Sequence, residues 1–127
     1  MGVGEDVFYD KNKIAIIPMG FCFPGYDGKG GDLPPRKECA IHWRALLMEV
    51  MPQLETCILV GGYAQKWHLG KGAKKTLTET VRAWKDYAPR YFATPHPSWR
   101  NTGWLKKNPW FEEELLPVLR RNIQKHI

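Results

Sequence analysis

A histidine, a serine and an arginine stand close together in the segment His96-Pro97-Ser98-Trp99-Arg100-Asn101. It follows the apolar run Tyr91–Thr94, which predicts a short strand. Pro95 and Pro97 fix φ and remove two backbone donors, so the turn after this strand is stiff. An imidazole, a hydroxyl and a guanidinium are then presented at the carboxyl end of a strand, where open α/β sheets bind ligands. The same residues also fit an ordinary proline-rich turn.

Basic and aromatic residues continue beyond this turn. Lys106 and Lys107 follow it, with Trp104 and Trp110 on either side. Cations for phosphates and flat rings for bases are what a single-stranded or extruded nucleotide needs. We expect Trp110 and Phe111 to pack the last helix onto a sheet, whereas Trp104 fits either packing or contact with a base.

Chain length and net charge limit the kinds of protein to which this sequence can belong. The chain has 127 residues, a length that predicts one domain over 1–127. Its formal charge of +6 at pH 7 favours an anionic partner such as nucleic acid. No apolar run approaches the roughly 18 residues of a membrane span. Residues 1–6 lack the basic and apolar regions of a signal peptide. We therefore expect a cytoplasmic protein without a membrane partner.

Three cysteines, Cys22, Cys39 and Cys57, do not predict a disulfide framework in such a chain. Cys57 lies in the apolar run Thr56–Val60 and fits a small core residue. Cys22 and Cys39 are candidate metal ligands, and His42 follows Cys39 by three residues. A zinc site built from these three would still lack a fourth ligand.

The remaining pattern alternates strands with helices. Strands are predicted at Ile14–Ile17, Thr56–Val60 and Tyr91–Thr94, and helices at Arg36–Met51, Tyr63–Leu69, Leu77–Tyr87 and from Asn108-Pro109 onward, with a kink at Pro117. Thr76 and Glu79 have the spacing of a capping box. The helix 36–51 carries an apolar stripe expected to face a core: Ala40, Trp43, Leu46, Leu47, Val50 and Met51. This order predicts an α/β fold with three layers, α/β/α, around a short parallel sheet.

In this order the features resemble the uracil-DNA glycosylase superfamily. His96-Pro97-Ser98 after a final strand, with the loop Trp99–Gly103, is similar to the family's second signature, and Ile58–Ala64 resembles its strand-to-helix turn. Cys22 and Cys39, with sixteen residues between them, resemble the second half of the four-cysteine iron–sulfur site in one branch. The resemblance runs from about Phe8 to the end.

This resemblance implies a role for each candidate residue. A glycosylase extrudes the damaged nucleotide, because the glycosidic bond is unreachable inside the base stack. His96 would be catalytic and would stabilise the negative charge on the departing base. The DNA-binding residues would be Ser98 at a phosphate, Arg100 as the wedge that fills the stack, Asn101, and Lys106 and Lys107, which add salt-dependent affinity.

The resemblance also implies what residues 1–127 lack. Residues 1–13 are too short and polar to hold the family's first strand, which is central to its sheet, and the Gly-Pro-rich loop that positions the attacking water. The chain is thus similar to the C-terminal two-thirds of a glycosylase domain. Cys22 and Cys39 are an incomplete ligand set, so we expect no cofactor here and an iron–sulfur cluster only in a longer parent. A missing central strand leaves sheet edges through which two copies could pair as a homodimer.

Three functions remain open from the sequence. The first is a uracil-DNA glycosylase-like DNA-repair protein that flips and excises a damaged base, with excision by this chain itself in question. The second is a catalytically silent nucleic-acid-binding α/β module. The third is an unrelated α/β domain in which His-Pro-Ser is structural.

Overall fold

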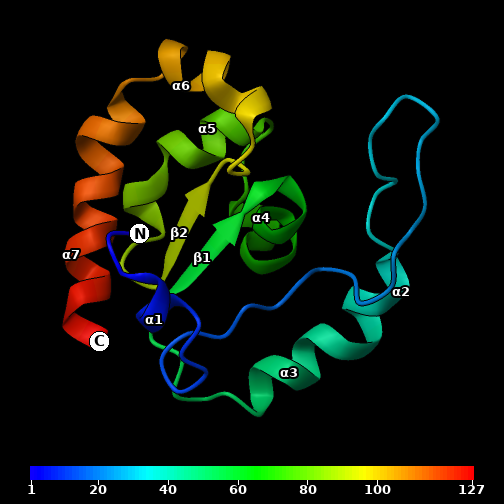
Figure 1. Ribbon diagram of the computed structural model, residues 1–127, viewed down its shortest axis with the longest axis horizontal. Helices are drawn as coiled ribbons and strands as arrows, with labels where there is room; N and C mark the ends of the chain where they lie inside the picture. The colour runs from blue at the N-terminus through cyan, green and yellow to red at the C-terminus, as the bar shows by residue number, and fades with distance from the viewer. The chain divides into compact units, whose positions relative to one another are not determined.

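The computed structural model describes residues 1–127, which divide into two compact units. Unit 1 comprises Met1–Ile14 and Glu55–Ile127, and unit 2 is Ala15–Leu54. Figure 1 labels the elements of both units. Because unit 2 leaves unit 1 at Ile14 and returns to it at Glu55, unit 2 is an insertion in the chain of unit 1.

Two short parallel strands lie at the centre of unit 1. They are β1 (Cys57–Val60) and β2 (Tyr91–Thr94), paired so that Cys57 faces Tyr91 and Val60 faces Thr94. Parallel strands need a long crossover, which here contains α4 (Gly61–Leu69), α5 (Leu77–Arg82) and 3₁₀ turns at Gly70–Gly72 and Trp84–Asp86. Figure 1 shows the strands between α4 and α7 (Leu116–His126). The predicted α/β class and parallel sheet are confirmed.

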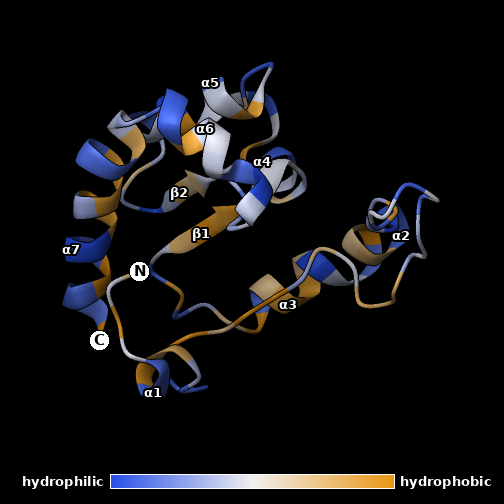
Figure 2. Ribbon diagram, turned by 45° about the horizontal axis from the view of Figure 1, so that its top comes forward, coloured by the Kyte–Doolittle hydropathy of each residue, from blue (hydrophilic) through white to orange (hydrophobic).

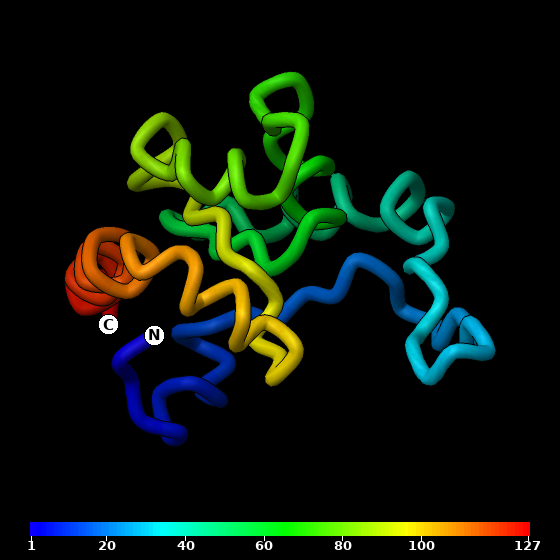
Figure 3. The backbone as a smooth tube through the Cα atoms, turned by 90° about the horizontal axis from the view of Figure 1, so that it is seen from above, coloured from blue at the N-terminus to red at the C-terminus, as the bar shows by residue number.

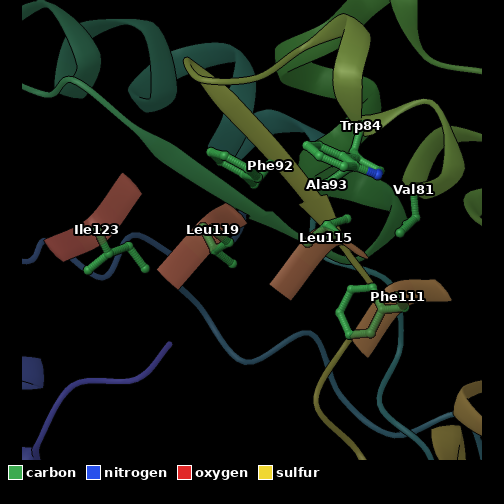
Figure 4. Close-up of a cluster of buried hydrophobic side chains, with 8 residues drawn as sticks. All are labelled: Val81, Trp84, Phe92, Ala93, Phe111, Leu115, Leu119 and Ile123. Carbon is green, nitrogen blue, oxygen red and sulfur yellow. The ribbon is translucent and has the colours of Figure 1, made fainter. Parts of the chain in front are cut away.

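A cluster of buried side chains holds α5, β2 and α7 together (Figure 4). Phe111, Leu115, Leu119 and Ile123 recur every four residues, so they share one helical face. The full cluster is Val81, Trp84, Phe92, Ala93, Phe111, Leu115, Leu119 and Ile123. Removing a Leu or Phe side chain from water contributes about 1.5–3 kcal/mol, so this face is what fixes α7 beside the sheet.

Local signals set where the helices of unit 1 begin. The predicted capping box is confirmed, since Thr76 Oγ1 accepts from Glu79 N at 3.2 Å and Glu79 Oε2 accepts from Thr76 N at 3.0 Å. Helix α4 begins at Gly61, two residues before the predicted start, because Gly61 has φ +81°. Such a φ is open to glycine and lets the strand turn directly into the helix.

The predicted last helix is present, with two local differences. Asn108 does not cap it: its side-chain amide donates to Trp104 O at 2.8 Å, and its Oδ1 accepts from Trp110 Nε1 at 3.2 Å. A π-helical turn, Phe111–Leu115, precedes α7, and Pro117 lies in the first turn of α7. At that position the missing N–H of proline is tolerated.

The first residues of the chain form α1 (Glu5–Phe8) followed by turns, and they contain no strand, as expected. Val3 packs against the core cluster of unit 1. Gln124 Nε2 of α7 donates to Gly2 O at 3.1 Å. This segment is therefore held against the last helix.

Unit 2 consists of a long loop and one helical run. The run comprises α2 (Lys37–Cys39), a π-helical turn (Ala40–Arg44) and α3 (Ala45–Glu49), which confirms the predicted helix to within two residues at each end. Arg44 is the one buried residue of this unit, and its Nη1 donates to Ile17 O at 3.0 Å and Pro18 O at 2.9 Å. The guanidinium therefore ties the helical run to the segment that precedes the loop.

Two predictions for this part of the chain are wrong. Ile14–Ile17 is irregular backbone rather than a strand, and Ile16 is 64% exposed; Figure 2 shows this apolar segment as coil. A strand persists only beside a hydrogen-bonding neighbour, and the sheet contains β1 and β2 alone. The apolar stripe on the helical run also faces no core, since Trp43 is 57% and Val50 71% exposed.

Candidate active site

His96 lies two residues beyond the end of β2, on the loop that leads towards α6 (Thr102–Lys107). Figure 3 follows the chain from β2 through this loop into α6 and α7. Pro95 is buried at the base of the loop, whereas His96 is exposed, and the imidazole makes no hydrogen bond within the protein. The ring is therefore presented on a stiff support with both nitrogens free for a ligand.

A set of short-range hydrogen bonds closes this loop. His96 O accepts from Ser98 N at 2.8 Å and from the side-chain amide of Asn101. Ser98 Oγ accepts from Arg100 N at 3.3 Å, and Ser98 O accepts from Asn101 N at 2.9 Å. The structure thus brings together four of the residues that the sequence singled out: His96, Ser98, Arg100 and Asn101.

The hydrogen bonds also show which groups remain available in the loop. Ser98 Oγ accepts one bond, so its hydroxyl hydrogen can still be donated. Asn101 uses its amide N–H on His96 O, which makes it a residue that shapes the loop, and its Oδ1 remains an acceptor. Arg100 is exposed, with its guanidinium carbon 5.7 Å from the ring centre of Trp99. Imidazole, hydroxyl and guanidinium donors therefore lie on one loop.

Gln65 fixes the strand ends from which the loop begins, and the sequence did not single it out. Its side chain is buried, 2% exposed, and Nε2 donates to Thr94 O at 2.9 Å and to Leu59 O at 3.4 Å. One amide of α4 thereby bridges the carboxyl ends of β1 and β2. A glutamine within a helix carries no sequence signal for this task, because only the register of the strands places the two carbonyls together.

Lys106 and Lys107, for which the sequence predicted no helix, lie in the last turn of α6. Both are exposed. Thr102 Oγ1, at the start of α6, donates to Trp99 O at 2.7 Å, so the helix follows the His96 loop directly. Cations at a helix C-terminus also interact favourably with the helix dipole.

The aromatic residues after the loop pack the core. Trp104 Nε1 donates to Thr78 Oγ1 at 2.8 Å. The centre of the Trp104 ring lies 5.9 Å from that of Trp110 and 5.5 Å from that of Phe111, with both pairs edge to face. Phe111 is buried, and Trp110 packs against the core cluster. The predicted packing role of Trp110 and Phe111 is confirmed, and of the two roles open to Trp104 the structure shows packing.

The cysteines do not assemble a metal centre from these residues. Cys22 is exposed and Cys39 half-buried in unit 2, while Cys57 is half-buried in β1 of unit 1. No group of three or more histidine, cysteine or acidic side chains is placed to hold a metal ion, so His42 does not complete a set with Cys22 and Cys39. Four thiolates hold an iron–sulfur cluster, and the described residues do not fit that requirement.

Comparison with known protein families shows to which family this chain belongs. The model of the uracil DNA glycosylase superfamily matches residues 1–120. The chain belongs to the uracil-DNA glycosylase superfamily. The matched residues contain both strands, the His96 loop and α6. The match begins at residue 1, whereas the resemblance seen in the sequence begins at about Phe8. Proteins of this superfamily act on DNA, and hydrolysis in DNA repair is the reaction class of the family. No helix in the chain is both long and apolar enough to cross a membrane.

Proposed function

We propose that this chain is a glycosylase-like DNA-repair protein in which the loop His96–Asn101 forms the leaving-group and phosphate half of a base-excision site. The observation that carries the proposal is the hydrogen-bonded His96 loop at the carboxyl end of β2, in a chain of this superfamily. Ligands of open α/β sheets bind at that edge.

His96 would act on the departing base. In hydrolysis of an N-glycosidic bond, water adds to the sugar carbon and the base leaves with the electron pair of the broken bond. The negative charge then develops on the base, and an N–H of a neutral imidazole can donate a hydrogen bond to it. The exposed His96 ring, which has no partner in the protein, is free to do so.

The remaining residues would hold the strand rather than the base. The Ser98 hydroxyl can donate to a phosphate beside the extruded nucleotide, and Arg100 can pair with a phosphate or stack. Asn101 supports this surface by holding the His96 carbonyl. Lys106 and Lys107 add affinity that falls with salt, because each neutralised phosphate releases counterions.

A second candidate function rests on the chemistry of the loop itself. The loop supplies an imidazole, a hydroxyl, an amide and a guanidinium, and none of these is a carboxylate that could activate water. Residues 1–13 form α1 and turns. The alternative is therefore a catalytically silent module that binds DNA through the same loop.

Uracil excision from single-stranded DNA separates the two candidates. The first candidate predicts that the chain releases uracil and that His96→Ala slows release by roughly 10²–10³-fold, the effect of removing one oxyanion donor. His42→Ala is the matched control, since His42 is an exposed histidine in unit 2. DNA binding that weakens steeply with salt and with Arg100→Ala, but without excision, identifies the silent module. A chain that shows neither excision nor salt-dependent binding rules out both.

Three further expectations accompany the proposal. Phe92 and Ala93 of β2 are fully buried, whereas Val60 of β1 is 42% exposed, so β1 offers the edge through which two copies could pair. A sedimentation mass of a single chain would contradict such a homodimer. Function without a bound cofactor and a cytoplasmic location also stay predictions.

A further inference from the structure

We propose that Trp99 is the stacking residue of this site and lies against an unpaired base next to the extruded nucleotide, while Arg100 contacts phosphate. The inference rests on the proposed function, since it assumes that the His96 loop meets DNA. It differs from the sequence-based expectation, which gave the stacking role to Arg100.

Trp99 is the most exposed of the six tryptophans, ahead of Trp43 at 57% and Trp67 at 37%. Its side chain is 81% exposed, the highest value among the exposed large hydrophobic residues. Trp84, Trp104 and Trp110 pack the core of unit 1, and the indoles of Trp104 and Trp110 donate hydrogen bonds there. The Trp99 indole N–H has no acceptor in the protein, and no other aromatic ring contacts this side chain. A large flat ring is thus left open to solvent.

Hydrogen bonds hold the backbone around Trp99, whereas the Trp99 side chain makes none. Ser98 Oγ accepts from Arg100 N at 3.3 Å on one side of Trp99, and Trp99 O itself accepts from Thr102 Oγ1 at 2.7 Å. Trp99 also begins a 3₁₀ turn that leads into α6. Binding to a ring on a fixed backbone costs little ordering entropy, so this placement favours recognition.

The surroundings of Trp99 match the chemistry of single-stranded nucleic acid. The guanidinium of Arg100 lies 5.7 Å from its ring centre, and the exposed Lys106 and Lys107 follow in α6. Aromatic faces that take bases beside cations that take phosphates are the usual combination in sequence-tolerant binding of single strands. His96 is three residues away, a distance of at most about 10 Å along extended chain. A base next to the one that contacts His96 therefore lies within reach of Trp99.

The test measures binding of an unmodified thymidine oligonucleotide, which requires no excision. We expect Trp99→Ala to weaken binding by roughly 5- to 150-fold, since base stacking on one aromatic residue contributes about 1–3 kcal/mol. Trp99→Phe should retain most of the affinity. The salt dependence should stay unchanged in Trp99→Ala, because no phosphate contact is lost, and become shallower by about one counterion in Arg100→Ala. Trp43→Ala is the matched control, since Trp43 is 57% exposed in unit 2.

An oligonucleotide of abasic sugars provides the second readout. It keeps the phosphates and removes the bases, so Trp99→Ala should bind it as well as the unchanged chain does. The proposal is overturned if Trp99→Ala binds thymidine oligonucleotide normally while Arg100→Ala is impaired, a result that leaves the proposed function intact. It is also overturned if Trp99→Ala changes only self-association in sedimentation, because the ring would then be a protein contact. Absence of DNA binding by the unchanged chain overturns both proposals.

Discussion

Unit 1 and unit 2 differ in what their apolar residues face. In unit 1 the helical face of Phe111, Leu115, Leu119 and Ile123 is buried against β2. In unit 2 the comparable stripe is exposed at Trp43, Leu46 and Val50 and nowhere fully buried, and the one buried residue is Arg44. Both helices follow from amphipathic sequence patterns, so periodicity decides that a helix forms but not that its apolar face finds a partner. Unit 1 has the sheet that covers its helix, and unit 2 has no sheet of its own.

The largest expected effect tests this difference in burial directly. Phe92→Ala should lower the free energy of unfolding by about 3–5 kcal/mol, because it empties a fully buried site in the core cluster of unit 1. Ile41→Ala in unit 2, where Ile41 is 72% exposed, should change it by no more than about 0.5 kcal/mol. Urea denaturation followed by circular dichroism measures both. Equal losses for the two variants would mean that the units do not differ as described.

A smaller effect tests what orders unit 2. Arg44→Met removes two hydrogen bonds from a buried guanidinium to Ile17 O and Pro18 O. A hydrogen bond from a charged donor contributes about 1.5–3 kcal/mol, so amide exchange within 15–54 should rise at least about 10-fold. Arg36→Met, at an exposed arginine of the same unit, is the control. Hydrogen exchange read by mass spectrometry would refute the idea if residues 15–54 kept their protection in Arg44→Met.

The smallest expected effect is the loss of stability at alkaline pH that comes from Tyr87 on the surface of unit 1. Tyr87 Oη donates to Gly72 O at 2.6 Å, and burial, with the negative charge of Asp86 adding to it, raises the pKa of Tyr87 above 10.0. The neutral phenol is thus favoured in the folded state, so its contribution is complete below pH 10.0 and is lost as pH rises through the higher folded pKa. Thermal unfolding above pH 10 should therefore lower the Tm of the unchanged chain more than that of Tyr87→Phe. The same alkaline loss in both proteins would exclude this contribution.

The sequence was sufficient where a signal is local. The runs Cys57–Val60 and Tyr91–Thr94 are strands, and the Thr76 capping box is present. It was insufficient where an element depends on a distant partner. Ile14–Ile17 has the composition of a buried strand but no neighbouring strand to pair with. Helix α6 was missed although Asn101 stands at its N-cap, because six residues are too few to show an apolar period.

The residues of the candidate site also fall into two groups, those placed by neighbours in the sequence and those placed by distant partners. His96, Ser98, Arg100 and Asn101 stand within six residues, so their proximity follows from the sequence alone. Gln65 is 29 residues from Thr94, and its bond to Thr94 O could be known only once β1 and β2 were in register. Trp104 could not be assigned because its partner Thr78 is 26 residues away.

The order of the core segments along the chain constrains how unit 1 folds. Helices α4 and α5 need only nearby residues, but pairing of β1 with β2 must close a loop over residues 61–90, and Gln124 reaches Gly2 across 122 positions. Contacts between distant residues form late, since the entropy of loop closure opposes them. During synthesis, Leu119 and Ile123 are among the last core residues to leave the ribosome. Trp104 and Leu105 of α6 pack against this core cluster, so the helix that follows the His96 loop reaches its final place only when the last helix docks.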